Sequence, residues 1–110
     1  MLMRYPGATI DQYDAAVAAC NLDADPPLGQ ILHVVVETPD GVESWDVWQT
    51  AETAQAFSEH RLGPALREAG VTEESEARVF PLHNLFAPDM DTVGRIGAFS
   101  LPSRASASIY

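Results

Sequence analysis

A histidine and an aspartate fall opposite each other in a predicted β-hairpin, and they are the first candidates for acid–base chemistry. A run rich in β-branched residues, 30–38, is followed by a second run, 42–49, and the turn Thr38-Pro39-Asp40-Gly41 lies between them, which is the pattern of a hairpin. With this turn His33 opposes Asp46, and opposed residues share one face of a sheet. A carboxylate fixes the tautomer of an imidazole that it holds, so His33 would act as a general base near neutral pH. The alternative is a cross-strand pair that only supports the sheet.

The same register divides the other hairpin residues between two faces. Trp48 shares the face of the pair, where its indole would stack on a substrate, and Ile31 and Val35 would line the same site. The opposite face is almost wholly apolar and would be a large hydrophobic patch in water, so we expect a second protomer to cover it in a homodimer. The residues of this opposite face are Leu32, Val34, Val36, Trp45 and Val47.

Three further candidates lie outside the hairpin. Phe57 and Arg61 lie along one face of a predicted helix capped by Thr50. Arg61 would hold an anionic or enolate oxygen at the mouth of a cavity, or it would lie on the surface as a solvated cation. His83, on the predicted last strand, is either a third catalytic group or a histidine held in the core or at the sheet edge.

Other chemistries lack the residues that they need. The three histidines, His33, His60 and His83, fall on three predicted elements and show none of the HxH or HExxH spacings of metal sites. No GxGxxG, GxxxxGK[ST] or GxSxG string occurs, which argues against nucleotide-binding and hydrolase sites. Cys20 is the single cysteine and falls on the predicted buried side of a helix. We therefore expect no metal, no cofactor and a solvent-facing His60.

The predicted elements follow the order βαββαβ. Thr9 and Gln12 form a capping box before the first helix, and Gly63-Pro64 must break or kink the second helix. Such a chain builds an α+β fold with one antiparallel sheet and both helices on one face. The expected elements are strand 2–5, helix 10–20, strands 30–38 and 42–49, a broken helix from Thr50 to Gly70, and strand 77–86, which Pro81 places at a sheet edge.

A C-terminal extension, residues 87–110, follows this unit, so we expect the domain itself to span 1–86. Asp89 would cap a short helix over 90–96. The apolar side chains of this helix, with Phe99 and Leu101, would be poorly placed in water. The extension would therefore lie over the cavity as a lid or across the partner as a dimer clasp.

The composition is that of one small acidic domain. The chain has 110 residues, 46% of them apolar, and a formal net charge of −10 from six basic and 16 acidic residues. Nucleic acid and anionic membrane surfaces are therefore disfavoured as partners. Apolar runs such as Val34-Val35-Val36 are far shorter than the about 20 residues that cross a bilayer. We expect a cytoplasmic protein.

Five stretches of the chain resemble small proteins of the dimeric α+β barrel superfamily. They are residues 6–14 (PGATIDQYD), 32–34 (LHV), 46–50 (DVWQT), 61–66 (RLGPAL) and 82–84 (LHN). Within that superfamily the chain looks most like the antibiotic-biosynthesis monooxygenase-like proteins. The resemblance covers about residues 1–86, and it implies a ferredoxin-like protomer, a second copy packed on the sheet, and an apolar cavity between sheet and helices.

The resemblance implies function more weakly than fold, because one fold hosts many activities. It points to a cofactor-independent enzyme acting on an apolar, aromatic or polyketide-like molecule, in which proton abstraction precedes oxygenation, cyclisation or isomerisation. The alternative is a non-catalytic ligand-binding or stress-related dimer. Haem handling ranks third, because the haem degraders carry an Asn on the first strand, where this chain has Leu2-Met3-Arg4-Tyr5.

Overall fold

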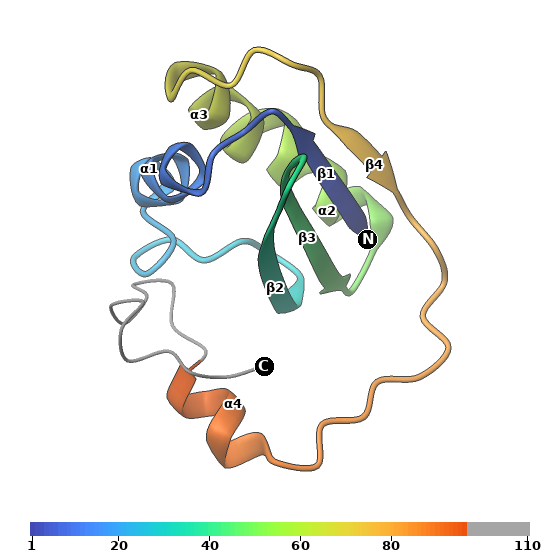
Figure 1. Cartoon of the computed structure of the whole chain (residues 1–110). Coiled ribbons are helices and arrows are strands. Elements are labelled where there is room, and N and C mark those ends of the chain that lie inside the picture. The colour runs from blue at the N-terminus through green and yellow to red at the C-terminus, as the bar shows by residue number, and fades with distance from the viewer. Residues whose placement is uncertain (97–110) are drawn as a thin grey trace.

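Four strands form one antiparallel sheet in the order β2-β3-β1-β4, and helices pack on one face of it (Figure 1). The computed structural model describes residues 1–96. The α+β class and the ferredoxin-like βαββαβ order are confirmed. The elements are β1 (Leu2–Pro6), α1 (Ile10–Cys20), β2 (Gln30–Thr38), β3 (Gly41–Trp48), α2 (Ala51–Phe57), η1 (Ser58–Leu62), α3 (Gly63–Glu68), β4 (Glu76–Arg78) and α4 (Met90–Ile96).

The β2–β3 hairpin has the predicted register. Thr38 lies opposite Gly41, and His33 lies opposite Asp46. A β-bulge at Ile31 interrupts the pairing near the start of β2, between Gln30 and Leu32. From Leu32 onward the alternation is regular, so the pair shares a face as predicted.

Helix α1 begins and ends where its capping residues predict. The Thr9 hydroxyl accepts from the Gln12 backbone N–H at 3.1 Å, and the Gln12 side chain accepts from the Thr9 N–H at 3.0 Å. This reciprocal pair satisfies two N–H groups that the first turn cannot bond internally. Asn21 ends the helix in the left-handed conformation, with φ of 53°.

The second helix continues through its Gly-Pro break by widening one turn. The Gly63 N–H donates to the Ser58 carbonyl, five residues back, so residues 58–62 form a π-helical turn, η1. Buried Phe57 and Leu62 are five residues apart, and an ordinary α-helix would rotate Leu62 away from the core. The wider turn returns Leu62 to the buried side, and Pro64 lies in the first turn of α3, where proline is tolerated.

The core lies between the sheet and these helices. Tyr5 and Val42 contribute to it from neighbouring strands, while Tyr13 and Phe57 contribute from α1 and α2. Packed apolar area of this kind supplies most of the driving force for folding. The cluster consists of Met3, Tyr5, Ala8, Tyr13, Ala16, Leu22, Val42, Phe57, Leu62, Leu66 and Val71.

The last strand is much shorter than the predicted 77–86. β4 contains three residues and ends at Arg78, which lies opposite Leu2, the first residue of β1. The strand has therefore reached the end of its partner, and Pro81 has no N–H to donate to a further ladder. The predicted edge position of this last strand, β4, is confirmed.

An exposed segment, residues 79–89, follows β4, and we call it the arm. Figure 1 shows it leaving the body of the molecule and running round to α4, which lies apart from the other helices. Helix α4 has the predicted bounds, and Asp89 caps it by accepting from the Thr92 N–H at 3.1 Å. The predicted docking of Phe99 and Leu101 lies outside the described residues. Several of the arm's large apolar side chains are exposed, namely Val79, Phe80, Leu82, Leu85 and Phe86.

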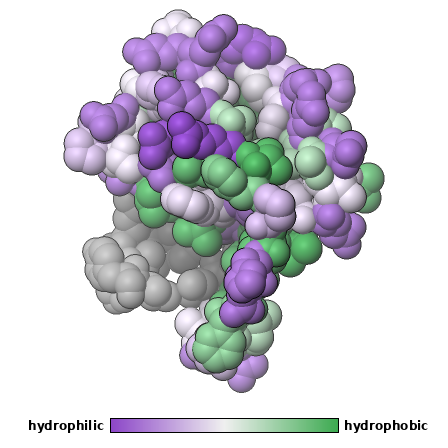
Figure 2. Space-filling view, turned by 90° about the vertical axis from the view of Figure 1, so that its right-hand side faces the viewer, coloured by the Kyte–Doolittle hydropathy of each residue, from purple (hydrophilic) through white to green (hydrophobic). Residues whose placement is uncertain are grey.

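The sheet face turned away from the helices is also exposed. Trp45, at 54% exposure, and Val34, at 46%, lie opposite each other on it. Figure 2 shows hydrophobic surface gathered across the middle of the side of the molecule on which β4 lies. We call the face defined by Val34, Val36 and Trp45 the open face.

Gly41 tests the junction between the hairpin and β1. Its φ is +151°, and a Cβ there would collide with the Tyr5 carbonyl oxygen of the neighbouring strand. We expect Gly41→Ala to lower the free energy of unfolding by about 1–3 kcal/mol, measured by urea unfolding. Gly94→Ala is the matched control, because a Cβ there meets nothing within 4 Å. Equal stability of the two variants would contradict this account of the junction.

Candidate functional site

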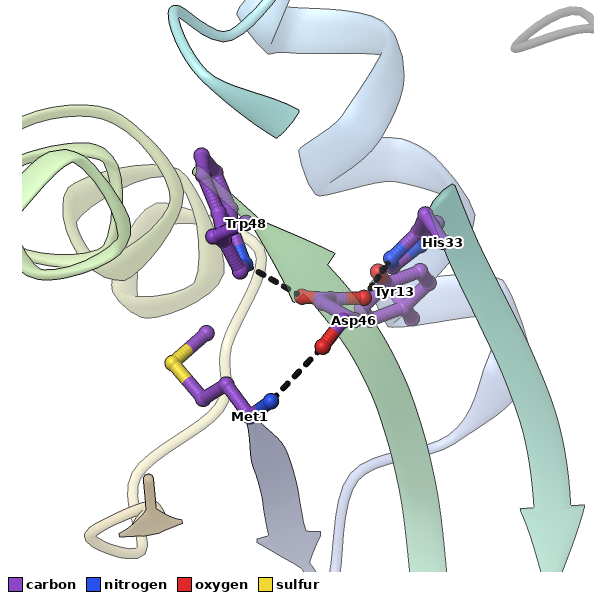
Figure 3. Close-up of polar contacts among 5 residues, drawn as sticks. All are labelled: Met1, Tyr13, His33, Asp46 and Trp48. Carbon is purple, nitrogen blue, oxygen red and sulfur yellow. Dashed lines mark hydrogen bonds and ion pairs between the residues drawn. The ribbon is translucent and has the colours of Figure 1, made fainter. Parts of the chain in front are cut away.

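The hairpin brings His33 and Asp46 into direct contact on the helix-facing side of the sheet (Figure 3). His33 Nδ1 and Asp46 Oδ1 form a hydrogen bond, so the predicted pairing is confirmed. The Asp46 side chain is only 5% exposed, and that of His33 is 23% exposed. A buried carboxylate requires partners for its charge, and the imidazole is one of them.

Asp46 is bonded on every side. Its Oδ2 accepts from the Trp48 indole N–H at 3.4 Å, while Oδ1 bonds His33. Its backbone N–H donates to the Met1 carbonyl at 2.8 Å, and its carbonyl accepts from the Met1 amino group at 2.6 Å. Figure 3 shows His33, on β2, and Trp48, on β3, at the two oxygens of the Asp46 carboxylate. The carboxylate is thus fixed in position by its neighbours.

Tyr13 joins His33, Asp46 and Trp48 in one hydrogen-bonded group, although it was not predicted as a site residue. Its hydroxyl lies 3.0 Å from His33 Nε2, across the sheet–helix boundary from α1. Tyr13 is seven residues before Cys20, which puts both on the same side of the first helix, and a buried tyrosine hydroxyl usually finds a hydrogen-bond partner. The need of a buried tyrosine hydroxyl for a partner is therefore the sequence feature that could have identified Tyr13.

Burial keeps two tyrosines of this layer in the neutral form. It raises the pKa of Tyr13 far above its ordinary value, with nearby Tyr5 and Asp46 adding to the effect. It likewise raises the pKa of Tyr5, which Asp46 raises further and a hydrogen bond with Ser44 partly offsets. The two rings lie 5.8 Å apart between centroids. The site is therefore lined by neutral phenols and one held carboxylate.

An aromatic wall stands beside the carboxylate. The Trp48 and Phe57 rings are 5.7 Å apart between centroids and tilted by 40°, a favourable aromatic geometry. Val35 is half-buried against the core. The structure thus brings Trp48, Phe57 and Val35 to the same side of the sheet as His33.

Arg61 forms hydrogen bonds with backbone carbonyls at the end of α1 and in the loop after it. Its Nη2 donates to the carbonyls of Cys20, at 2.9 Å, and Asp25, at 2.6 Å, and the guanidinium lies over the Phe57 ring at 5.5 Å. The π turn moves Leu62 into the buried position and leaves Arg61 at its margin. Arg61 therefore ties the loop after α1 to the second helix.

Two predicted site residues lie apart from the group. Ile31 sits at the β-bulge and is 56% exposed. His83 lies in the exposed arm and not on a strand, because β4 ends at Arg78. The bulge and the short strand account for both differences. His60 is solvent-exposed, as predicted.

The described residues give no sign of a metal centre or a membrane span. No group of three or more His, Cys, Asp or Glu in residues 1–96 is placed to hold a metal ion. Over the same range, no helix has the length and apolar character to cross a bilayer. Cys20 is a free thiol whose pKa is raised by burial, against an opposing effect of Arg61. A small hollow of about 60 Å³ lies elsewhere, lined by Pro6, Gly7, Gln12 and residues 70–73.

Comparison with known proteins identifies no relative. No protein-family model matches the chain, and no curated protein or solved structure shows significant similarity to it. The functional argument therefore depends on the geometry of the site.

That geometry is suited to proton transfer. The Asp46 carboxylate can only accept, so the proton of a neutral imidazole lies on Nδ1, and the Tyr13 hydroxyl then donates to His33 Nε2. A base whose tautomer and orientation are fixed by a carboxylate is the arrangement used in general-base catalysis. The neighbouring indole and phenyl rings offer a surface for an apolar or aromatic molecule.

The buried phenols predict a loss of stability in alkali. A tyrosine whose pKa is higher in the folded state stabilises that state fully below its unfolded pKa, near 10, and the contribution is lost as the pH rises. We expect the free energy of unfolding to fall above pH 10, by up to about 1.4 kcal/mol per pH unit for each of Tyr5 and Tyr13. Urea unfolding between pH 8 and 11 measures this, and Tyr5→Phe and Tyr13→Phe should each reduce the slope. An unfolding free energy independent of pH over this range would contradict the assignment.

Proposed function

We propose that the protein is a cofactor-independent enzyme that acts on an apolar, aromatic or polyketide-like small molecule, with His33 as its general base. The observation that carries this proposal is the buried Asp46 carboxylate bonded to Nδ1 of a partly exposed imidazole. A sheet does not need a buried charge for its stability, and well-packed apolar residues often serve as well or better. A buried pair beside an aromatic wall is therefore a functional candidate.

The reaction begins with a proton transfer. His33 Nε2 takes an acidic proton from the substrate, which becomes an enolate or phenolate, and Asp46 stabilises the imidazolium that forms. Trp48 and Phe57 hold the apolar body of the substrate. In a cofactor-free monooxygenase, the carbanionic carbon then adds to molecular oxygen, and the peroxide takes the proton back from His33 and loses water to leave a carbonyl. In a cyclase or isomerase, the same carbanion closes a ring or shifts a double bond.

The resemblance to the dimeric α+β barrel superfamily supports the same class. The strand order β2-β3-β1-β4 is that of a ferredoxin-like protomer, and the residues that resemble the antibiotic-biosynthesis monooxygenase-like proteins include Asp46 and Trp48. A cavity between the sheet and the helices remains part of the proposal.

One observation favours a second candidate, a non-catalytic ligand-binding dimer. Both ring nitrogens of His33 are already bonded, one to Asp46 and one to Tyr13. A histidine so occupied can serve as a structural bridge between β2, β3 and α1. In that case a metabolite would bind without being changed.

We further propose that a second copy of the chain covers the open face. Val34, Val36 and Trp45 are all more than two-fifths exposed there, beside the Arg4–Glu43 ion pair. Large apolar side chains exposed together on one face mark an interaction site. The arm carries further exposed apolar side chains beyond the sheet edge. Residues 87–110 would then clasp the partner, or else act as a lid over the site.

Substitutions at the pair test the enzymatic proposal. His33→Ala should lower turnover by on the order of 100-fold or more, because it removes the base. Asp46→Asn should cost less, because the base itself remains. The measurement is product formation and oxygen consumption with a panel of hydroxyaromatic and β-dicarbonyl compounds. His60→Ala is the matched control at an exposed histidine. Full activity of both site variants, combined with earlier melting, would show that the pair is structural.

Light scattering tests the dimer. At micromolar concentration we expect the mass of two chains, with an apolar interface above about 2,000 Å² in total. Trp45→Lys should produce monomers by placing a charge in that interface, whereas Glu52→Lys, at an exposed position on α2, should not. A monomeric wild type whose Trp45 is quenched by aqueous iodide would rule out this use of the open face.

A further inference from the structure

The Nε2 nitrogen of His33, the atom that must receive a proton in the proposed reaction, is occupied in the structure. The Tyr13 oxygen lies 3.0 Å from it. The two ring planes are within 15° of parallel and their centroids are 6.4 Å apart. The hydroxyl therefore approaches the edge of the imidazole, where the Nε2 lone pair lies.

Tyr13 is the donor in this contact when the His33 imidazole is neutral. Its side chain is buried, with the whole residue only 3% exposed, and burial raises its pKa, so the phenol keeps its proton. Nδ1 of the same imidazole faces the Asp46 carboxylate, which can only accept. The ring thus accepts at Nε2 and donates at Nδ1, which is the tautomer a general base requires.

We propose that Tyr13 caps the base, and that a substrate frees it by inserting an acidic O–H group, phenolic or enolic, between the Tyr13 hydroxyl and His33 Nε2. The inference rests on the proposed function and narrows its substrate class. This inference makes Tyr13 part of the proposed active site, although Tyr13 lies 20 residues from His33 in the sequence.

A hydroxyl suits this position better than a carbon acid. The inserted oxygen can donate its proton to Nε2 and accept the hydrogen bond of Tyr13 at the same time, so no buried polar group loses its partner. A C–H group can do neither well, and sites built to bond a hydroxyl reject analogues that lack one.

The proton balance is simple. The substrate O–H bond breaks and an N–H bond forms at Nε2, which leaves an oxyanion and an imidazolium. Tyr13 then donates to the oxyanion, and Asp46 faces the cation. The proton remains on His33 until the product or water takes it back.

Acylation of histidine by diethyl pyrocarbonate tests the cap without any turnover, because an unprotonated ring nitrogen with a free lone pair attacks the carbonyl carbon of the reagent. The exposed His60 and His83 serve as internal standards in each sample. We expect His33 in the wild-type protein to react at least tenfold more slowly than His60. Tyr13→Phe should raise the His33 rate about tenfold, as followed by peptide mass spectrometry.

Tyr5→Phe is the matched control. Tyr5 is as buried as Tyr13 and lies beside it, but its hydroxyl bonds Ser44 and not His33. A general loosening of the fold would raise the His33 rate in both variants, and loss of the cap would raise it in Tyr13→Phe alone. A wild-type His33 as reactive as His60, equal rates in the two variants, or no change in Tyr13→Phe would each overturn the proposal.

Two probes then test the substrate class. In Tyr13→Phe, added phenol should slow the acylation of His33, and anisole, which has the same ring but no O–H donor, should not. Protection by both compounds, or by neither, would overturn the assignment to O–H acids.

The ¹⁵N resonance of His33 Nε2 gives a spectroscopic readout. It should move downfield in Tyr13→Phe, toward the position of a nitrogen that accepts no hydrogen bond, and stay in place in Tyr5→Phe. An unmoved resonance in Tyr13→Phe would contradict the cap. These outcomes do not depend on activity. If the wild type is inactive but His33 is capped, the proposed enzymatic function is wrong and the cap stands. If the wild type is active but His33 is not capped, the cap is wrong and the enzymatic function stands.

Discussion

A carboxylate buried in the middle of the sheet is the constraint on which the rest of the site depends. Asp46 is 5% exposed at its side chain, and an unpaired charge there would be costly. His33 and the Trp48 indole supply its hydrogen bonds. Tyr13 in turn satisfies the far side of His33. Among the described residues, no buried side-chain nitrogen or oxygen is left without a partner. One charged residue on β3 thereby fixes the positions of β2 and α1.

Much of this arrangement could be predicted because it depends on local rules. The four-residue turn at Thr38–Gly41 sets the hairpin register, and a strand's period of two then puts His33 and Asp46 on one face. The Thr9 and Asn21 caps set the bounds of α1 in the same way. These features need only the residues next to them in the sequence.

The features that could not be predicted depend on contacts between distant segments. The Tyr13–His33 bond requires the rotation of α1 over the sheet, which periodicity alone does not give. The length of β4 depends on where its partner β1 begins, so alternation of residue types over 77–86 overestimated it. The position of Arg61 depends on the π turn over Ser58–Leu62, which a regular period of 3.6 residues does not predict. The sequence signal for it is that the two apolar residues Phe57 and Leu62 are five residues apart.

Asp46 and His33 stabilise each other as a coupled pair, and a double-mutant cycle measures that coupling directly. It compares the unfolding free energies of the wild type, His33→Ala, Asp46→Ala and the double variant in urea at pH 7. Hydrogen bonds to charged groups contribute about 1.5–3 kcal/mol, so the account predicts a coupling energy of that size. Additivity of the two substitutions to within about 0.5 kcal/mol would contradict it, because residues that do not interact behave in that way.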